Sequence, residues 1–225
     1  MPFNGFTKES ITFLKELAAN NNKEWFEKNR ETYQNEIFLP LKQLAIDLGP
    51  VINKIDEKID ITPQFNRTIS RIYRDTRFSN DKSPFRTDQW LSFKRPVKIF
   101  GNVPEFFFYI TPEEYHTGMG YYAATPLNME KFRSFVDNHP DHFDLIIKNF
   151  ESDKKYQLLG DEYKKRIPNP HPEKFQDWYN KKSFYVACST MIDRKFFSPE
   201  LGREIADRFR FEAELYSFII EAISI

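Results

Sequence analysis

Two kinds of residue are scarce in this sequence. It holds one cysteine, Cys188, and seven glycines in 225 residues. A single cysteine excludes an intrachain disulfide and a cluster of thiolate metal ligands. Glycine usually makes up ~7% of a protein, so its scarcity leaves little room for glycine-rich loops that hold phosphates. No P-loop and no G-x-S-x-G nucleophile motif occurs.

Long apolar runs and an excess of charge are also missing. The most apolar central run, Phe106 to Ile110, is much shorter than the ~20 residues of a membrane helix. The start, MPFNGFTKES, has neither the basic region nor the apolar core of a signal peptide. Lys plus Arg and Asp plus Glu both number 33, and this neutrality argues against a protein that coats nucleic acid. We expect a soluble, cytoplasmic protein with no membrane partner.

Aromatic residues are abundant, at 17% of the chain, and exclude a disordered protein. Apolar periodicity predicts helices over about 8–19, 23–38, 41–49, 126–137, 141–150 and 200–222, with Trp25 and Phe26 as buried anchors of the second. We expect the helix over 41–49 to stop at Gly49-Pro50, because proline disfavours a helix interior. The prediction for 51–59 stays open between helix and loop.

Strand signals cluster between these helical blocks. They cover about 68–74, 89–94, 105–111, 119–124 and 184–189, with an extended piece near 156–160. The aromatic run Phe106 to Tyr109 is typical of a strand buried on both faces. We therefore expect an α+β fold: one domain over residues 1–225, with a mainly antiparallel sheet packed by the N-terminal and C-terminal helices.

Positive charge gathers in residues 67–98. This segment holds nine basic and three acidic side chains, an excess of six positive charges, so the rest of the neutral chain carries the matching negative excess. The basic residues are Arg67, Arg71, Arg74, Arg77, Lys82, Arg86, Lys94, Arg95 and Lys98, and the acids are Asp75, Asp81 and Asp88.

Four motifs together resemble a known family, the conserved bacterial and fungal family labelled domain of unknown function 2461. They are RIYRDTRFSNDKSPFRTD at 71–88, NNNKEWFEKNRETY at 20–33, Gly-Met-Gly-Tyr at 118–121, and LLGDEYKKRIP at 158–168. The resemblance covers nearly the whole chain. It implies a single α+β domain with no established activity, and it supplies no catalytic residues.

The basic segment has two interpretations. In the first it is an anion site, because the planar guanidinium fork of arginine suits carboxylates and phosphates. In the second, Asp75 and Asp81 pair with the arginines and hold a long loop, in exposed ion pairs worth ~0–1 kcal/mol each. The surplus of bases supports the first. The candidate ligand-binding residues are Arg71, Arg74, Asp75, Arg77, Lys82 and Arg86, with Gly118, Gly120 and Tyr121 beside them. We expect at least three of the five cations to share one concavity near 118–122.

Other chemistry-bearing residues give weaker signals. Gly118 and Gly120 are typical of a hairpin turn between two strands, and alternatively form a backbone wall of the arginine pocket. His139 and His142 have metal-ligand spacing, but Pro140 separates them and no third ligand is evident, so we expect no metal site. His116 is the best candidate for a general base. Cys188 reads as a core thiol rather than a nucleophile.

The leading functional hypothesis is therefore a pocket, binding or enzymatic, for a small anionic ligand, in which the arginines stabilise negative charge. No nucleophile and no cofactor is assigned. The alternative is a nucleic-acid or protein interaction module, since Tyr73, Phe78, Phe85, Trp90 and Phe93 interleave with the charges. A third hypothesis is a structural or partner-binding protein without a pocket.

Overall fold

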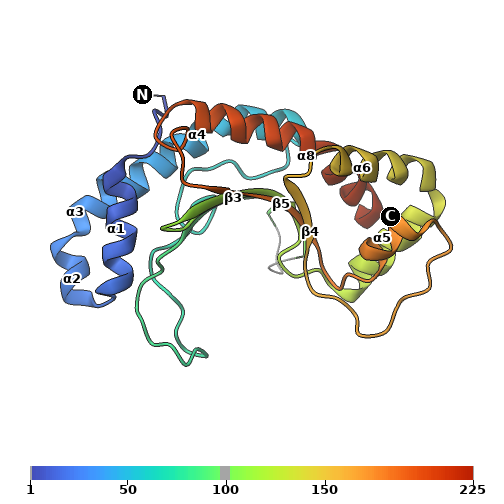
Figure 1. The fold of residues 1–225 in the computed structure, drawn as a ribbon, viewed down its shortest axis with the longest axis horizontal. Coiled ribbons are helices and arrows are strands. Elements are labelled where there is room, and N and C mark those ends of the chain that lie inside the picture. The colour runs from blue at the N-terminus through green and yellow to red at the C-terminus, as the bar shows by residue number, and fades with distance from the viewer. Residues whose placement is uncertain (1, 97–101, 225) are drawn as a thin grey trace. The chain divides into compact units, whose positions relative to one another are not determined.

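The computed structural model describes residues 2–96 and 102–224, and Lys98 of the basic segment lies outside them. The fold is α+β with a five-stranded antiparallel sheet in the order β1-β2-β3-β5-β4, which confirms the predicted class. Figure 1 shows the elements. The strands are β1 (Gln89–Lys94), β2 (Glu105–Ile110), β3 (Glu114–Gly120), β4 (Tyr156–Leu159) and β5 (Tyr185–Met191).

The chain forms two compact units. Unit 1 comprises Met1–Phe93, Phe107–Thr117 and Thr190–Asp207, and unit 2 comprises Lys94–Phe106, Gly118–Ser189 and Arg208–Ile225. Each is described by itself below. That residues 1–225 behave as one domain stays a prediction.

Unit 1 begins with α1 (Lys8–Ala19), which has the predicted bounds. The Thr7 hydroxyl accepts a hydrogen bond from the Ser10 amide, and the Ser10 hydroxyl accepts one from the Thr7 amide. This reciprocal cap satisfies two amides that have no partner inside the helix. Phe6 packs between Phe108 of β2 and Phe196, so the N-terminal segment is part of the core of this unit.

The predicted helix over 23–38 consists of three pieces: α2 (Lys23–Lys28), α3 (Arg30–Tyr33) and the π-helical turn η1 (Gln34–Phe38). Trp25 is only partly buried, which contradicts the prediction that it anchors the core. It lies against Phe13 at a ring-centroid distance of 5.6 Å. The neighbouring Phe26 is buried, at 1% exposure, which confirms its prediction as a core anchor.

The prediction of a stop at Gly49-Pro50 is wrong, because α4 (Leu39–Ile55) continues through Pro50. Proline removes one helical hydrogen bond and costs ~3 kcal/mol in a helix interior. Both Pro50 and Ile46, whose carbonyl loses its donor, are exposed, so water can bond that carbonyl. Burial of Leu48 and Ile52 on the other side of the helix favours the continued helix.

Two strand predictions need correction. Residues 68–74 form only isolated bridges, Ile69 to Leu91 and Tyr73 to Phe85, rather than a strand. The strand expected at 119–124 begins earlier, at Glu114, because the turn after β2 is closed by the Thr111 amide bonding the Glu114 carbonyl. The core side of β2 and β3 carries the buried rings of Phe108 and Tyr115.

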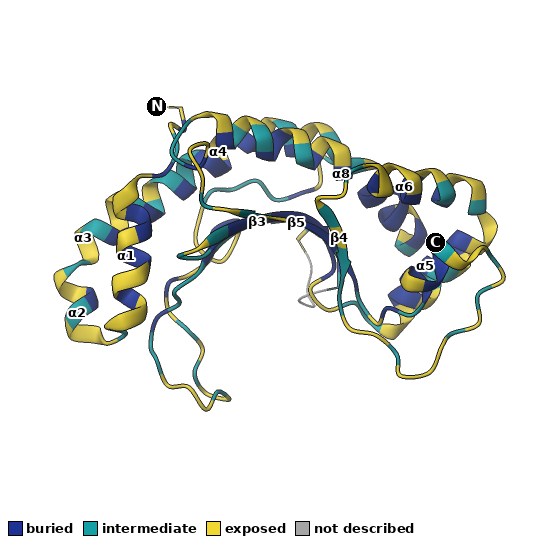
Figure 2. Cartoon of the chain, viewed as in Figure 1, coloured by how far each residue is buried: buried dark blue, intermediate teal, exposed yellow. Residues whose placement is uncertain are grey.

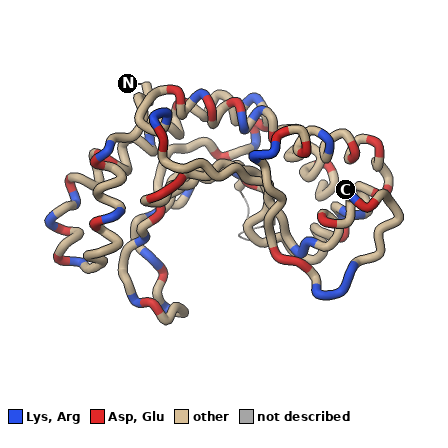
Figure 3. Tube along the Cα trace, in the orientation of Figure 1, with Lys and Arg blue, Asp and Glu red and all other residues tan. Residues whose placement is uncertain are grey.

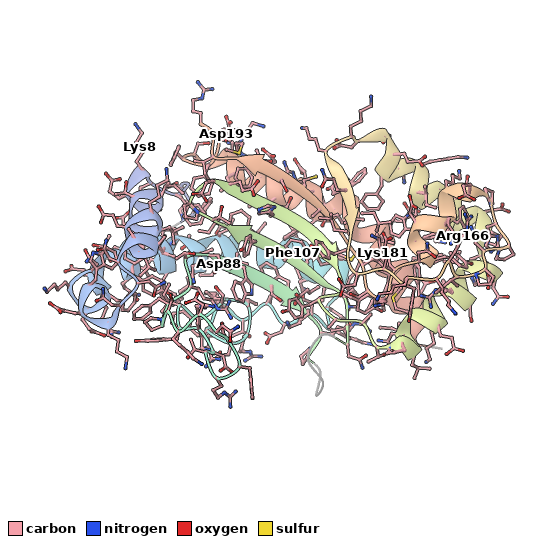
Figure 4. The ribbon with its side chains drawn as sticks, turned by 60° about the horizontal axis from the view of Figure 1, so that its bottom comes forward. Lys8, Asp88, Phe107, Arg166, Lys181 and Asp193 are labelled. Atoms are coloured by element: carbon pink, nitrogen blue, oxygen red, sulfur yellow. The ribbon has the colours of Figure 1, made fainter. Side chains whose placement is uncertain are left out.

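The strand β2 is also not buried on both faces. Phe106, Phe108 and Ile110 are fully buried, whereas Phe107 and Tyr109 are partly exposed. Figure 2 colours the chain by burial, and Figure 4 labels Phe107. The aromatic run therefore follows the period of two that is typical of an antiparallel strand with one open face. A continuous run of large apolar residues hides this alternation in the sequence.

Unit 2 holds α5 (Pro126–Asn138) and α6 (Pro140–Ser152), close to their predicted bounds. The 3-10 turn η2 (Glu173–Phe175) and α7 (Gln176–Tyr179) were not predicted. The last helix, α8 (Glu200–Ser224), extends from unit 1 into unit 2. Within residues 2–96 and 102–224, no helix has the length and apolar character that crossing a membrane requires.

Candidate functional site

A pocket of about 800 Å³ lies in unit 1. One side is formed by α2, α3 and η1, which contribute Phe26, Arg30 and Tyr33. The other side is formed by the segment 65–73, which contributes Phe65 and, at its end, the residues Arg71 and Tyr73. Four aromatic rings and two arginines thus line one space.

The local sequence explains the wall that α2 and α3 form. The Asn22 side chain caps α2 by accepting from the Trp25 amide, and the Asn29 side chain donates to the Trp25 carbonyl where α2 ends. The short break at Asn29 precedes Arg30 and Tyr33. Phe26 fixes this wall to the opposite side, because its ring stacks on Phe85 with centroids 4.2 Å apart.

Arg30 is held in place before any ligand arrives. Its guanidinium donates to both carboxylate oxygens of Glu27, at 2.9 and 2.5 Å. The Glu27 carboxylate and, after it, the Tyr73 hydroxyl raise the pKa of Arg30 above its ordinary value. Because this pair is exposed, it orients Arg30 more than it stabilises the fold.

Tyr33 carries a buried hydroxyl without a partner. Its side chain is 5% exposed, and no residue in the described part of the chain forms a hydrogen bond with its oxygen. Burial, followed by the nearby Tyr73, raises the pKa of Tyr33 well above its ordinary value, so the phenol stays protonated. A buried polar group that is left unsatisfied in a pocket wall is unusual and needs an explanation.

Arg71 is the predicted site residue that lines this pocket. It is exposed, and within residues 2–96 and 102–224 it makes no hydrogen bond and no ion pair within 4 Å. Its positive charge helps to lower the pKa of Asp75, after the larger effect of Arg77. Arg71 is thus available to a ligand.

The following cations of the loop have local partners. Arg74 pairs with Asp81, and Arg77 pairs with Asp75 through a two-nitrogen contact of 2.6 to 3.2 Å. The Lys82 ammonium donates to the Thr76 carbonyl at 2.9 Å. Arg77 holds the pKa of Asp75 at about 2. These contacts match the structural interpretation of the segment, in which Asp75 and Asp81 pair with arginines and hold the loop.

Arg86 lies at the base of the loop. Its guanidinium is 4.7 Å from the ring centroid of Trp90, within the range of a cation–π contact. Its amide bonds the Ile72 carbonyl at 2.7 Å. Near this base, Asp88 accepts a hydrogen bond from the Tyr109 hydroxyl at 2.8 Å (Figure 4 labels Asp88).

Gly118, Gly120 and Tyr121 belong to unit 2. The two glycines lie within β3, so the prediction that they form a hairpin turn is wrong. Gly120 has φ +152°, and a Cβ there would lie 2.4 Å from the Phe184 carbonyl oxygen. Glycine is therefore required for close backbone approach, and the Tyr121 amide bonds the same carbonyl at 2.8 Å. Tyr121 itself is buried.

The histidines and the cysteine have structural surroundings. His139 contacts the Phe135 carbonyl, and His142 contacts Glu214 at 3.3 Å. His116 lies 3.3 Å from the Glu114 carboxylate. No group of three or more potential metal ligands occurs within the described ranges. Burial raises the pKa of Cys188 to about 11, so its thiol is a weak nucleophile at neutral pH.

A comparison with protein families shows which family the chain belongs to. The family model described as "Conserved hypothetical protein (DUF2461)" matches residues 9–218 of 225. The chain belongs to this family. No curated protein matches it at a significant level. Two motifs of this DUF2461 protein contribute residues to the pocket. The motif at 20–33 contains Phe26, Arg30 and Tyr33, and the motif at 71–88 begins with Arg71.

The sequence interpretation therefore missed half of this site. It placed the anion site in 71–86 and did not consider Arg30 or Tyr33. The signal was present in the motif at 20–33, where Arg30 follows the Trp-Phe pair by a little more than one turn. Read alone, that stretch is an ordinary amphipathic helix.

Proposed function

We propose that this protein binds a small molecule with one carboxylate or phosphate group in the pocket of unit 1, with Arg71 as the residue that contacts the anion. The observation that carries the proposal is the combination at one pocket of an arginine without a close partner and a buried phenol without a partner. Arg71 supplies a charged donor and Tyr33 a neutral one, both suited to an oxyanion.

The charges of the pocket favour a ligand of low charge. Glu27 neutralises Arg30, and Lys28 pairs with Glu24 at 2.8 Å. Glu31 also lines the pocket and would repel a polyanion. One anionic group is therefore the complement of the remaining charge of Arg71.

The walls favour a ligand with a flat apolar part. Phe26, Phe65 and Ile72 line the pocket, and Phe65 is 40% exposed in the absence of a ligand. Covering an exposed aromatic ring with an apolar group is favourable by ~25 cal/mol per Å² buried. The pocket volume of about 800 Å³ lies within the usual range of sites for drug-sized molecules. We assign no catalytic residue. We propose that the protein binds this ligand in the cytoplasm.

Thermal-shift measurements test the proposal. Benzoate and phenyl phosphate combine one anionic group with a flat ring, and inorganic phosphate and benzyl alcohol each supply only one of these features. We expect the first two to raise the melting temperature most. A ligand at ~100 times its dissociation constant adds about 2.7 kcal/mol to the free energy of unfolding.

Arg71→Ala should abolish most of this shift and leave the unliganded melting temperature unchanged, because Arg71 is exposed and unpaired. Arg77→Ala is the matched control: it removes an exposed arginine of the same loop that does not line the pocket. If Arg71→Ala keeps the full response to benzoate and phenyl phosphate, the proposed contact is wrong. If none of the four compounds shifts the wild type, the proposed ligand class is wrong.

A further inference from the structure

The loop 74–84 of unit 1 is closed at its base and extends away from the strands of that unit (Figure 1). At its base the Arg74 amide bonds the Pro84 carbonyl at 2.9 Å, and Tyr73 bridges Phe85. Asn21 fixes Phe85 from the helical side, by donating to its carbonyl and accepting from its amide. The base is thus held to the body of unit 1 by several independent contacts.

The tip of the loop also has hydrogen bonds of its own. The Asp75 carboxylate accepts from the Arg77 amide, the Asp81 carboxylate accepts from the Ser83 amide, and Lys82 bonds the Thr76 carbonyl. The two aspartate contacts each close a turn, because the side chain accepts a hydrogen bond from the amide two residues later. A loop with this many internal hydrogen bonds presents its outward side chains in a defined arrangement.

Phe78 is the outward side chain that this arrangement presents. It is 94% exposed, the highest value among the exposed large apolar residues of the described chain. The Arg77 guanidinium lies 5.7 Å from the centroid of its ring. A fully exposed phenylalanine in an internally bonded loop suggests that a partner covers the ring.

The charges around the ring indicate an anionic partner. Between residues 71 and 86 five cations stand against two acids, and without Arg71, which lines the pocket, an excess of two positive charges remains (Figure 3). The two acids are each bound by an arginine, Asp75 by Arg77 and Asp81 by Arg74. Because the whole chain is neutral, this attraction is local and would act over a few phosphates rather than along a duplex.

The composition of the tip favours nucleic acid over a lipid surface. Phe78 is flanked by Arg77 and by Ser79-Asn80, so one ring stands among polar groups. Anchoring to a bilayer needs a larger apolar surface or a lipid chain. A nucleobase needs only one ring to stack on, and its phosphates need nearby cations.

We propose that the loop 74–84 is a docking element for single-stranded nucleic acid, in which Phe78 stacks on a base while Lys82 and the neighbouring arginines contact phosphates. The contact is independent of the base sequence, because every base has a face to stack on. It is a second binding surface, separate from the pocket between α2–α3 and segment 65–73, and it does not depend on the ligand proposed for that pocket.

Fluorescence anisotropy with a labelled twenty-nucleotide oligo(dT) tests this proposal through two separable signatures. Stacking predicts that Phe78→Ala weakens binding about 5- to 150-fold at every salt concentration, whereas Phe78→Trp retains it. The phosphate contacts predict that the logarithm of affinity falls with the logarithm of salt concentration with a slope of about −2 for three contacts. Lys82→Ala should make that slope shallower by about 0.7.

Two variants in α6 of unit 2 are matched controls. Leu145→Ala removes a side chain of a residue that is 55% exposed, and Lys148→Ala removes an exposed lysine. Neither should change binding. Equal binding by Phe78→Ala and wild type would overturn the stacking role. No binding of oligo(dT) to the wild type would overturn the proposal, and so would Phe78-dependent binding to phosphatidylserine vesicles in its place.

Discussion

At the scale of single residues, Glu212 in α8 shows how burial decides protonation. It is fully buried in unit 2, and one carboxyl oxygen has no hydrogen-bond partner among the described residues. The other accepts from the Tyr156 hydroxyl at 3.1 Å. Burial raises the pKa of Glu212 well above 4.5, more than Tyr156 and Arg208 lower it. The carboxyl group therefore keeps its proton to a higher pH in the folded protein than in the unfolded chain.

This predicts a stability that falls as pH rises. Since the pKa of Glu212 is higher in the folded state than in the unfolded state, its contribution is fully present below about pH 4.5 and is lost above that value. Glu212→Gln keeps the shape of the neutral acid and has no proton to lose. We expect the variant to lose less stability than wild type between about pH 5 and pH 8 in urea denaturation. Glu221→Gln, at an exposed position of the same helix, is the control. Identical pH dependence in all three proteins would show that Glu212 ionises without cost.

A second prediction at this scale separates two adjacent aromatics. Phe26→Ala should cost ~3–5 kcal/mol of unfolding free energy, the range for a buried ring, because Phe26 is 1% exposed and stacks on Phe85. Trp25→Ala should cost less, since Trp25 is partly exposed. Chemical denaturation of both variants measures the difference. A larger loss for Trp25→Ala would restore the sequence interpretation that the tryptophan anchors the core.

At the scale of elements, the predictions that succeeded rest on local signals. Thr7 and the asparagines after Ala19 fix both ends of α1, because caps act on neighbouring amides and carbonyls. The predictions that failed depend on distant contacts. Pro50 is tolerated because other residues bury the opposite face of α4, and 68–74 is not a strand although its composition is typical of one.

The glycines of β3 and α4 give a prediction for these elements. Gly120→Ala should be destabilising by more than 1 kcal/mol, because φ is +152° and the added Cβ would overlap the Phe184 carbonyl. Gly49→Ala should be neutral or stabilising by up to ~1 kcal/mol, since Gly49 is helical and the nearest atom to its Cβ is a flexible Ile61 methyl at 3.5 Å. Thermal unfolding of the two variants checks the opposite signs. Equal effects would mean that the backbone near Gly120 adapts.

The candidate site was predictable in part for the same reason. Arg71 and its loop stand out as a surplus of charge in one segment, and a surplus can be counted from the sequence. The sequence does not show which cation remains without a partner. It depends on Asp75 and Asp81 reaching Arg77 and Arg74, and on α3 placing Tyr33 opposite Arg71. The aromatic walls were assigned to the core because a periodic pattern does not distinguish a pocket from a packed interior.

At the scale of the whole molecule, the neutral charge conceals an uneven distribution. The family match extends over residues 9–218, so it covers most of both units and contains both motifs of unit 1. We propose different chemistry for two neighbouring features of unit 1: one small anion for the pocket lined by Arg71, and single-stranded nucleic acid for the loop tip at Phe78.

The central claim is the contact between Arg71 and an anion, and a crystal structure with 4-bromobenzoate tests it most directly. The bromine gives an anomalous signal that locates the ligand without interpretation of weak density. We predict one strong peak among Phe26, Phe65 and Ile72, with the carboxylate within hydrogen-bond distance of Arg71 and of the Tyr33 hydroxyl. A bromine peak outside this pocket, or a carboxylate turned away from Arg71 in it, would contradict the account.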